Sequence, residues 1–197
     1  MSATEQADLP LFPLRTVLFP CGRLPLRIFE QRYLDMAKVC LRDGSPFGVC
    51  LIREGGEVGS PALLEDVGCL ARIVEWDMPQ LGVLQVLARG ERRFRIRGQR
   101  AQADGLLRAR VELLAEETDV PLEADTDLCA RVLRKAIESG GEELVQPPLN
   151  YASAAWVSAR LAELLPLSLA AKQRLLEMDE ARDRIEILRR LISSTGQ

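Results

Sequence analysis

Leu9-Pro10-Leu11-Phe12-Pro13-Leu14 begins the stretch that decides the fold of this chain, and the stretch continues to Tyr33. It places four prolines among large apolar side chains. Proline lacks an N–H and fixes φ, so it occurs at strand ends, edges and bulges rather than in central strands. The stretch therefore predicts short, broken apolar strands that turn a tight corner and lead into a helix. We expect six of its apolar side chains to lie largely in the core: Leu11, Phe12, Leu14, Phe19, Leu26 and Phe29.

The composition is that of a globular protein. The chain has 197 residues, 47% of them hydrophobic and 28% charged, which is enough for a core without crosslinks. Its net charge of -3 gives no general attraction to nucleic acid or to an anionic membrane. The sequence holds no histidine, which excludes a Ser-His-Asp triad and any zinc site built on imidazole. Its five cysteines form no C-x-x-C pair, which indicates no metal site, and Cys50 and Cys69 lie in apolar runs, where we predict buried free thiols.

Apolar side chains recur mostly at every second position up to about residue 118, which indicates β-strands. One helix interrupts them, predicted over Glu30–Asp43 and stopped by Gly44. Turn residues separate the strands at short intervals, which favours an antiparallel meander in a strongly curved sheet or open barrel. The predicted strands after the helix are Phe47–Ile52, Cys69–Trp76, Leu81–Leu87, Arg92–Arg97 (after a tight corner at Arg89-Gly90-Glu91) and Leu106–Leu114.

Beyond residue 120 the apolar spacing becomes helical. Four helices are predicted: Thr126–Glu138, Ser153–Leu165, one that Ser168 caps and that ends near Met178, and one that Asp179 caps. Strands followed by helices predict an α+β protein with a β-rich lobe over 1–118 and an α-helical bundle over 119–197. The acidic stretch Glu116–Pro121 is the expected joint.

The motifs of the common enzyme classes are missing from the sequence. None of the three lysines, Lys38, Lys135 and Lys172, follows a glycine, so there is no phosphate-binding P-loop. Each lies on a predicted amphipathic helix, where a solvated lysine is expected rather than the base of a Ser-Lys pair. We interpret carboxylate pairs such as Glu142-Glu143 as solvated charges in loops. We therefore expect no catalytic residue and no cofactor.

The chain carries no recognisable targeting signal. Residues 1–6 lack a basic region and an apolar region, so they do not form a signal peptide. The apolar segment Leu161–Ala171 contains Glu163 and Pro166 and is too short to span a bilayer. These features predict a cytoplasmic protein with no membrane partner.

Two segments are candidate binding surfaces. Arg93, Arg95 and Arg97 alternate along a predicted strand and would share one face, which suits RNA phosphates or an acidic peptide. The alternative is the polar side of a half-buried strand whose arginines pair with acids on a neighbouring strand.

The second candidate surface lies at the predicted turn Asp77–Gln80. Trp76, Met78 and Leu81 flank this turn and would form an apolar surface for exposed hydrophobic segments of other polypeptides. Alternatively, Trp76 folds back and covers the open end of the barrel.

Several segments in the same order resemble the N-terminal domain of the Lon protease family. They are Leu9–Leu14, Leu24–Glu30, Val67–Ile73, Gly90–Ile96 and Leu164–Met178, and the likeness covers roughly residues 9 to 193. The resemblance implies a PUA-like β-lobe followed by a helical bundle. It also implies a substrate-recognition role toward unfolded or partner polypeptides, beside a protease or chaperone system. The ATPase and Ser-Lys peptidase modules of that family are absent from this sequence, so we expect a non-catalytic protein-binding module; an RNA-binding module that uses the arginine face is the alternative.

Overall fold

The computed structural model describes residues 5–56, 62–122, 127–140, 145 and 147–195. The chain divides into two compact units, Met1–Ala115 and Glu116–Gln197, and each is described by itself. No helix among the described residues has the length and apolar character needed to cross a membrane. The predicted carboxylate pair Glu142-Glu143 lies outside the described residues.

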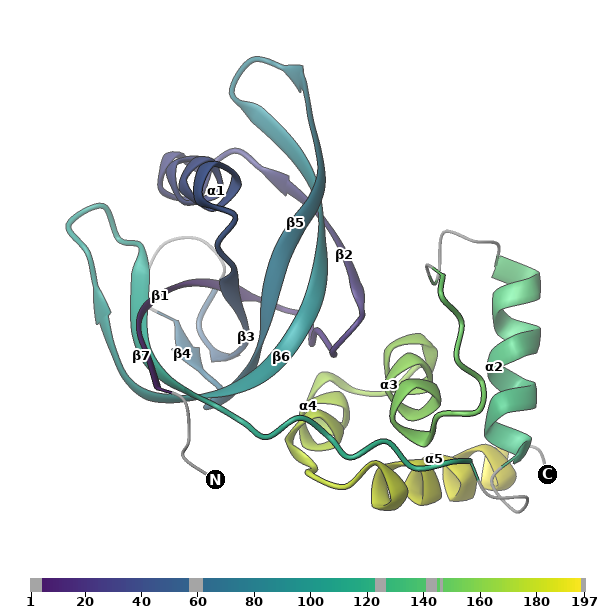
Figure 1. Ribbon diagram of the computed structural model, residues 1–197. Helices are drawn as coiled ribbons and strands as arrows, with labels where there is room; N and C mark the ends of the chain where they lie inside the picture. Colours follow the sequence, from purple (N-terminus) through teal and green to yellow (C-terminus); the bar gives the residue numbers. More distant parts are fainter. Residues whose placement is uncertain (1–4, 57–61, 123–126, 141–144, 146, 196–197) are drawn as a thin grey trace. The chain divides into compact units, whose positions relative to one another are not determined.

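The first unit is a barrel with one helix (Figure 1). Its elements are β1 (Glu5–Leu14), β2 (Arg23–Ile28), α1 (Gln31–Asp43), β3 (Phe47–Glu54), β4 (Leu63–Leu64), β5 (Val67–Gln80), β6 (Val83–Ala101) and β7 (Leu107–Leu113). The sheet follows the order β1-β7-β6-β5-β3-β4, and β2 pairs with β6. The strongly curved and mostly antiparallel sheet is as predicted.

A parallel pairing between β1 and β3 closes this sheet into a ring, where an open antiparallel barrel was expected. Leu11 lies opposite Gly48, and the register continues to Leu14 opposite Leu51. Parallel neighbours need a long crossover connection, usually one that contains a helix. Here β2 and α1 provide that crossover between the two strands.

β6 is one continuous strand, and the corner predicted at Arg89-Gly90-Glu91 is wrong. The strand pairs with β2 and β5 along its first part and with β7 along its second part. Gly90 is needed because another segment passes close to it. A Cβ at Gly90 would lie 2.1 Å from the carbonyl oxygen of Phe19. The Gly90 N–H donates to Gly22 O at 2.9 Å, and Gly90 O accepts from Cys21 N at 2.8 Å.

The proline-rich opening forms part of the barrel core. Leu11, Phe12, Leu14 and Phe19 are buried, as predicted, and the ring of Phe12 stacks on Tyr33 of α1 with centroids 4.2 Å apart. Leu26 is only partly buried against the core. The prediction for Phe29 is wrong, since 62% of this residue is exposed. The preceding Ile28 takes the inward position at the end of β2.

α1 begins and ends within one residue of its prediction. Gly44 adopts the left-handed conformation with φ of 60° and ends the helix. The buried face of the helix consists of Tyr33, Met36, Ala37 and Cys40, which pack into the same core cluster as Phe12 and Phe47.

The second unit contains the four predicted helices, α2 (Asp127–Gly140), α3 (Ala154–Leu164), α4 (Leu169–Glu177) and α5 (Ala181–Thr195). Ser153 and Ser168 cap α3 and α4, because their hydroxyls accept from Trp156 N at 2.9 Å and Ala171 N at 3.2 Å. α3 contacts each of the other three helices.

The acidic stretch after residue 115 is tied to these helices. Ser153 Oγ donates to Asp119 at 2.6 Å, and Pro121 forms an isolated β-bridge with Ser153. Arg184, with 1% of its side chain exposed, pairs with Glu117 and donates to Ser158 Oγ at 2.9 Å. Residues 117–121 therefore pack as part of the helical unit.

Candidate functional site

The tip of the β5–β6 hairpin carries a cluster of exposed apolar side chains. Trp76 is 60% exposed, Met78 46% and Leu81 92%. The chain reverses at Leu81-Gly82 rather than at Asp77–Gln80, because Gly82 supplies the positive φ of 81° that the turn requires. The hairpin projects beyond the rest of the barrel at the top of Figure 1. Trp76 therefore does not fold back as a buried cover, and we call these three residues the hairpin surface.

A groove of about 480 Å³ lies beside the hairpin surface, and its lining comes from β2, β5 and β6. Pro25 and Glu75 both lie opposite Leu87 of β6, one on each side of it. In the next row, Arg27 and Asp77 flank Gln85 in the same way. The groove thus has apolar side chains at its centre, basic residues on β2 and acidic residues on β5.

The charged walls of this groove do not neutralise each other directly, since Arg27 forms no ion pair with Glu75 or Asp77. Strands lie about 4.8 Å apart, so side chains on β2 and β5 start about 10 Å from one another with β6 between them. The side chains of Arg27 and Glu75 make no hydrogen bond or ion pair with any described residue. Both walls are therefore available to a ligand that lies over Pro25 and Leu87.

The three arginines predicted to share one exposed face do not do so. Arg93 is buried, with 3% exposed, and lies opposite Cys69 in the wall of the barrel. Arg95 is half-buried, and Arg97 is exposed and pairs with Glu112 of β7 through Nε at 2.7 Å. A register shift between Ile96 and Gly98 breaks the alternation on which the prediction relied. The pairing of Arg97 with an acid on a neighbouring strand is the alternative considered from the sequence.

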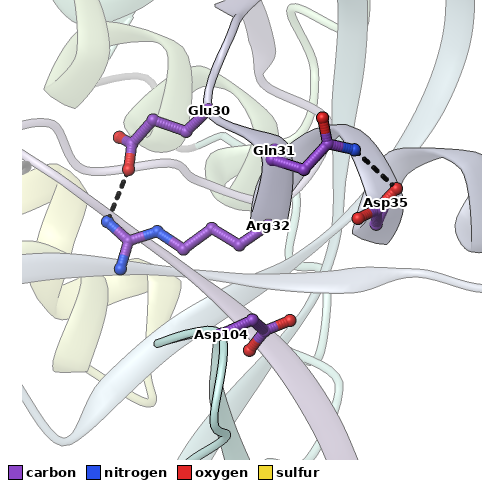
Figure 2. Close-up of a pocket in the computed structure, with 5 residues that line it drawn as sticks. All are labelled: Glu30, Gln31, Arg32, Asp35 and Asp104. Atoms are coloured by element: carbon purple, nitrogen blue, oxygen red, sulfur yellow. Dashed lines mark hydrogen bonds and ion pairs between the residues drawn. The ribbon is translucent and has the colours of Figure 1, made fainter.

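A second, polar hollow of about 430 Å³ lies at the start of α1 (Figure 2). Sequence reasoning did not single out any of its residues. Arg32 donates to Glu30 at 2.7 Å and to Gly105 O at 3.2 Å, and Gln31 donates to Asp35 at 2.9 Å. These hydrogen bonds engage most of the polar groups of the hollow, although the buried Arg32 Nε has no partner among the described residues, and no cluster of metal-ligating residues occurs in the described part of the chain. The hollow therefore offers no evident chemistry.

The cysteine and lysine side chains have structural surroundings, and burial changes the pKa of several of them. Burial raises the pKa of Cys50 far above the usual range of a thiol, and burial is also the main cause that raises the pKa of Cys40. Lys172 is half-buried rather than solvated, and desolvation lowers its pKa. Its Nζ donates to Glu163 O at 2.6 Å, and within the described residues no serine hydroxyl is bonded to it. No described lysine therefore belongs to a Ser-Lys pair.

The comparison with protein families places the chain in a class of substrate-binding domain. The family model of the ATP-dependent protease La (LON) substrate-binding domain matches residues 8–194. The chain belongs to this family, which confirms the resemblance inferred from the opening sequence.

Solved structures and curated relatives agree with this assignment. A Lon N-terminal domain protein from Xanthomonas campestris is 38% identical, with a TM-score of 0.78 over 93% of this chain and 97% of that one. The N-terminal domain of a Mycobacterium avium complex Lon protease shares the fold at 18% identity, with a TM-score of 0.67 over 92% of this chain and 95% of that one. A Lon protease of Anaeromyxobacter dehalogenans is 28% identical over 95% of this chain and 23% of its own length. The chain spans about a quarter of the length of the curated relatives that it matches.

Proposed function

We propose that this protein binds exposed apolar segments of unfolded or partner polypeptides and acts as a non-catalytic recognition module. The observation that carries the proposal is the hairpin surface, where Trp76, Met78 and Leu81 keep large apolar side chains exposed. Exposed apolar clusters of this kind occur at interaction sites, because covering them removes apolar area from water. The membership of the LON substrate-binding family supports the same role.

The adjoining groove would extend the contact along a bound segment. An apolar side chain of the ligand would lie over Pro25 and Leu87, and its polar neighbours would face Arg27 on β2 and Glu75 on β5. Complete burial of one large apolar side chain contributes about 1.5–3 kcal/mol. Two or three such contacts give about 3–9 kcal/mol before the cost of association, which suits weak binding of many different segments.

The remaining features of the proposal concern architecture and setting. We infer that the barrel is PUA-like and that residues 119–197 act as a helical bundle, supported by the contacts of α3 with α2, α4 and α5. We further propose that the protein works in the cytoplasm beside a protease or chaperone system. RNA binding through Arg93, Arg95 and Arg97 is not proposed, because the burial of Arg93 removes it from the face that would contact phosphates.

The test is binding of a fluorescein-labelled peptide that alternates leucine and phenylalanine with serine, compared with an all-serine peptide of equal length. We expect wild-type protein to bind only the apolar peptide, with little dependence on salt. Replacing Trp76, Met78 and Leu81 together by serine should weaken binding by at least about tenfold, or about 1.4 kcal/mol.

Leu63→Ser is the matched control, because Leu63 lies in the same unit and is 47% exposed, close to the exposure of Met78. This variant should bind as the wild type does. Equal binding by the triple variant, with folding verified by circular dichroism, would contradict the assignment of the site to the hairpin surface.

A further inference from the structure

A second groove, of about 500 Å³, lies on the outer face of β1, β7 and β6, three strands that run side by side in Figure 1. We call it the basic groove; it is lined by Asp8, Gly98, Gln99, Arg100, Arg108, Ala109 and Arg110. Leu9 and Ala109 lie opposite each other and are buried on the inner side. Successive strand residues alternate between faces, so Arg108 and Arg110 point outward.

Gly98 leaves the middle of this groove open. It lies opposite Arg110 in the pairing of β6 with β7, and a Cβ at this position would meet nothing within 4 Å. Arg110 is exposed, and its side chain makes no hydrogen bond or ion pair with any described residue. The Arg110 guanidinium, which has no partner among the described residues, therefore lies beside the open space at Gly98.

The other two arginines already show that this surface binds a carboxylate. Arg100 Nη2 donates to one oxygen of Asp8 at 2.6 Å, and Arg108 Nη1 donates to the other at 2.9 Å. Arg108 Nη1 also donates to the main-chain oxygen of Asp8 at 2.8 Å, while its buried Nε has no partner among the described residues. Three arginines around one carboxylate leave two positive charges without compensation.

We propose that the basic groove binds an acidic polypeptide segment, with a glutamate or aspartate carboxylate of the ligand on Arg110. Guanidinium and carboxylate form short, charge-assisted hydrogen bonds, often two at once. The groove has no aromatic side chain on which a nucleic-acid base would stack. The overall charge of -3 also opposes a densely charged polyanion such as RNA more strongly than a short acidic peptide. This surface is separate from the hairpin surface and its role does not depend on the apolar site.

The experiment measures fluorescence polarisation of a labelled peptide of alternating glutamate and serine with the full chain. We expect saturable binding at low salt that weakens at about 0.15 M ionic strength, where the Debye length is about 8 Å. Arg110→Glu should weaken binding by about tenfold or more, because it replaces attraction by repulsion at the contact. Gly98→Leu should weaken it similarly by filling the groove without changing any charge.

Arg53→Glu is the matched control, since Arg53 is also exposed on a strand of the same unit and has no partner among the described residues. It should bind the peptide as the wild type does, and so should the triple serine variant of the hairpin surface. The proposal is overturned if Arg53→Glu weakens binding as much as Arg110→Glu, or if neither groove variant changes it. It is also overturned if an oligouridylate of equal charge binds more tightly than the peptide and if the same variants lose this RNA binding.

Discussion

Replacing Gly90 by alanine tests the close approach of residues 19–22 to β6. The added Cβ would lie 2.1 Å from Phe19 O, and both the N–H and the carbonyl of Gly90 are bonded to the 21–22 corner. An ordinary carbon–oxygen contact needs about 1 Å more, so the corner must move away. Overpacking costs about 1–3 kcal/mol. Weakening two hydrogen bonds adds about 0.5–1.5 kcal/mol each.

Gly90→Ala should therefore lower the free energy of unfolding of the barrel unit by about 2–6 kcal/mol, a large share of the 5–15 kcal/mol typical of a domain. Hydrogen exchange in urea, followed by mass spectrometry on peptides of β6 and β7, measures this unit separately from the helices. Gly98→Ala is the control on the same strand, because a Cβ there meets nothing within 4 Å. A loss below about 1 kcal/mol for Gly90→Ala, or equal losses for both variants, would refute the reasoning.

Further predictions concern the helical unit and the thiols. Arg184→Ala should lower the unfolding free energy of the helical unit by about 3–5 kcal/mol, because it leaves the mostly buried Glu117 without its partner; urea unfolding measures this, and adding Glu117→Leu should restore most of the loss. In the native protein one thiol, Cys21, should react rapidly with a maleimide at mildly alkaline pH, since it is exposed and the other four are buried; Cys21→Ser should abolish the fast phase in mass spectra. Hydrogen bonds from Arg189 and then Arg190 lower the pKa of Glu186 from 4.5 to about 2, so its stabilising effect is complete above pH 4.5 and is lost as the pH falls toward 2. Acid unfolding of Glu186→Gln should lack this component, and an identical acid transition would contradict it.

Elements whose signals are local were predictable from the sequence. α1 ends at Gly44, and Ser153 and Ser168 cap α3 and α4, because a left-handed glycine and a capping hydroxyl act on backbone groups a few residues away. The prolines of the opening indicated short, broken strands, and this is wrong for β1, which runs over ten residues through Pro10 and Pro13 and pairs with β7 and β3. The apolar residues of the β5–β6 hairpin were visible in the sequence, and the structure exposes them.

Features that depend on distant pairing were not predictable. The corner predicted at Gly90 is wrong because a glycine is required there by the close approach of Phe19, which lies 71 positions earlier in the chain. The prediction that the arginines share one exposed face is wrong because a bulge after Ile96 shifts the register of β6, so that Arg93 and Arg97 have different surroundings. The basic groove was missed because its arginines come from two strands and its opening from an absent side chain at Gly98.

The sequence by itself determined the family of this protein, the succession of a strand-rich part and four helices, and the absence of familiar enzyme motifs, because these follow from residue type and short-range periodicity. Tertiary structure alone decided that β1 closes the ring against β3, that Phe29 is exposed and Arg93 buried, and where the two grooves lie. The physical reason is that burial and pairing depend on which distant segment reaches each position. The proline-rich opening shows both levels: its residues indicate apolar strands that lead into a helix, whereas only the folded chain makes β1 a ten-residue strand paired with β7 and β3.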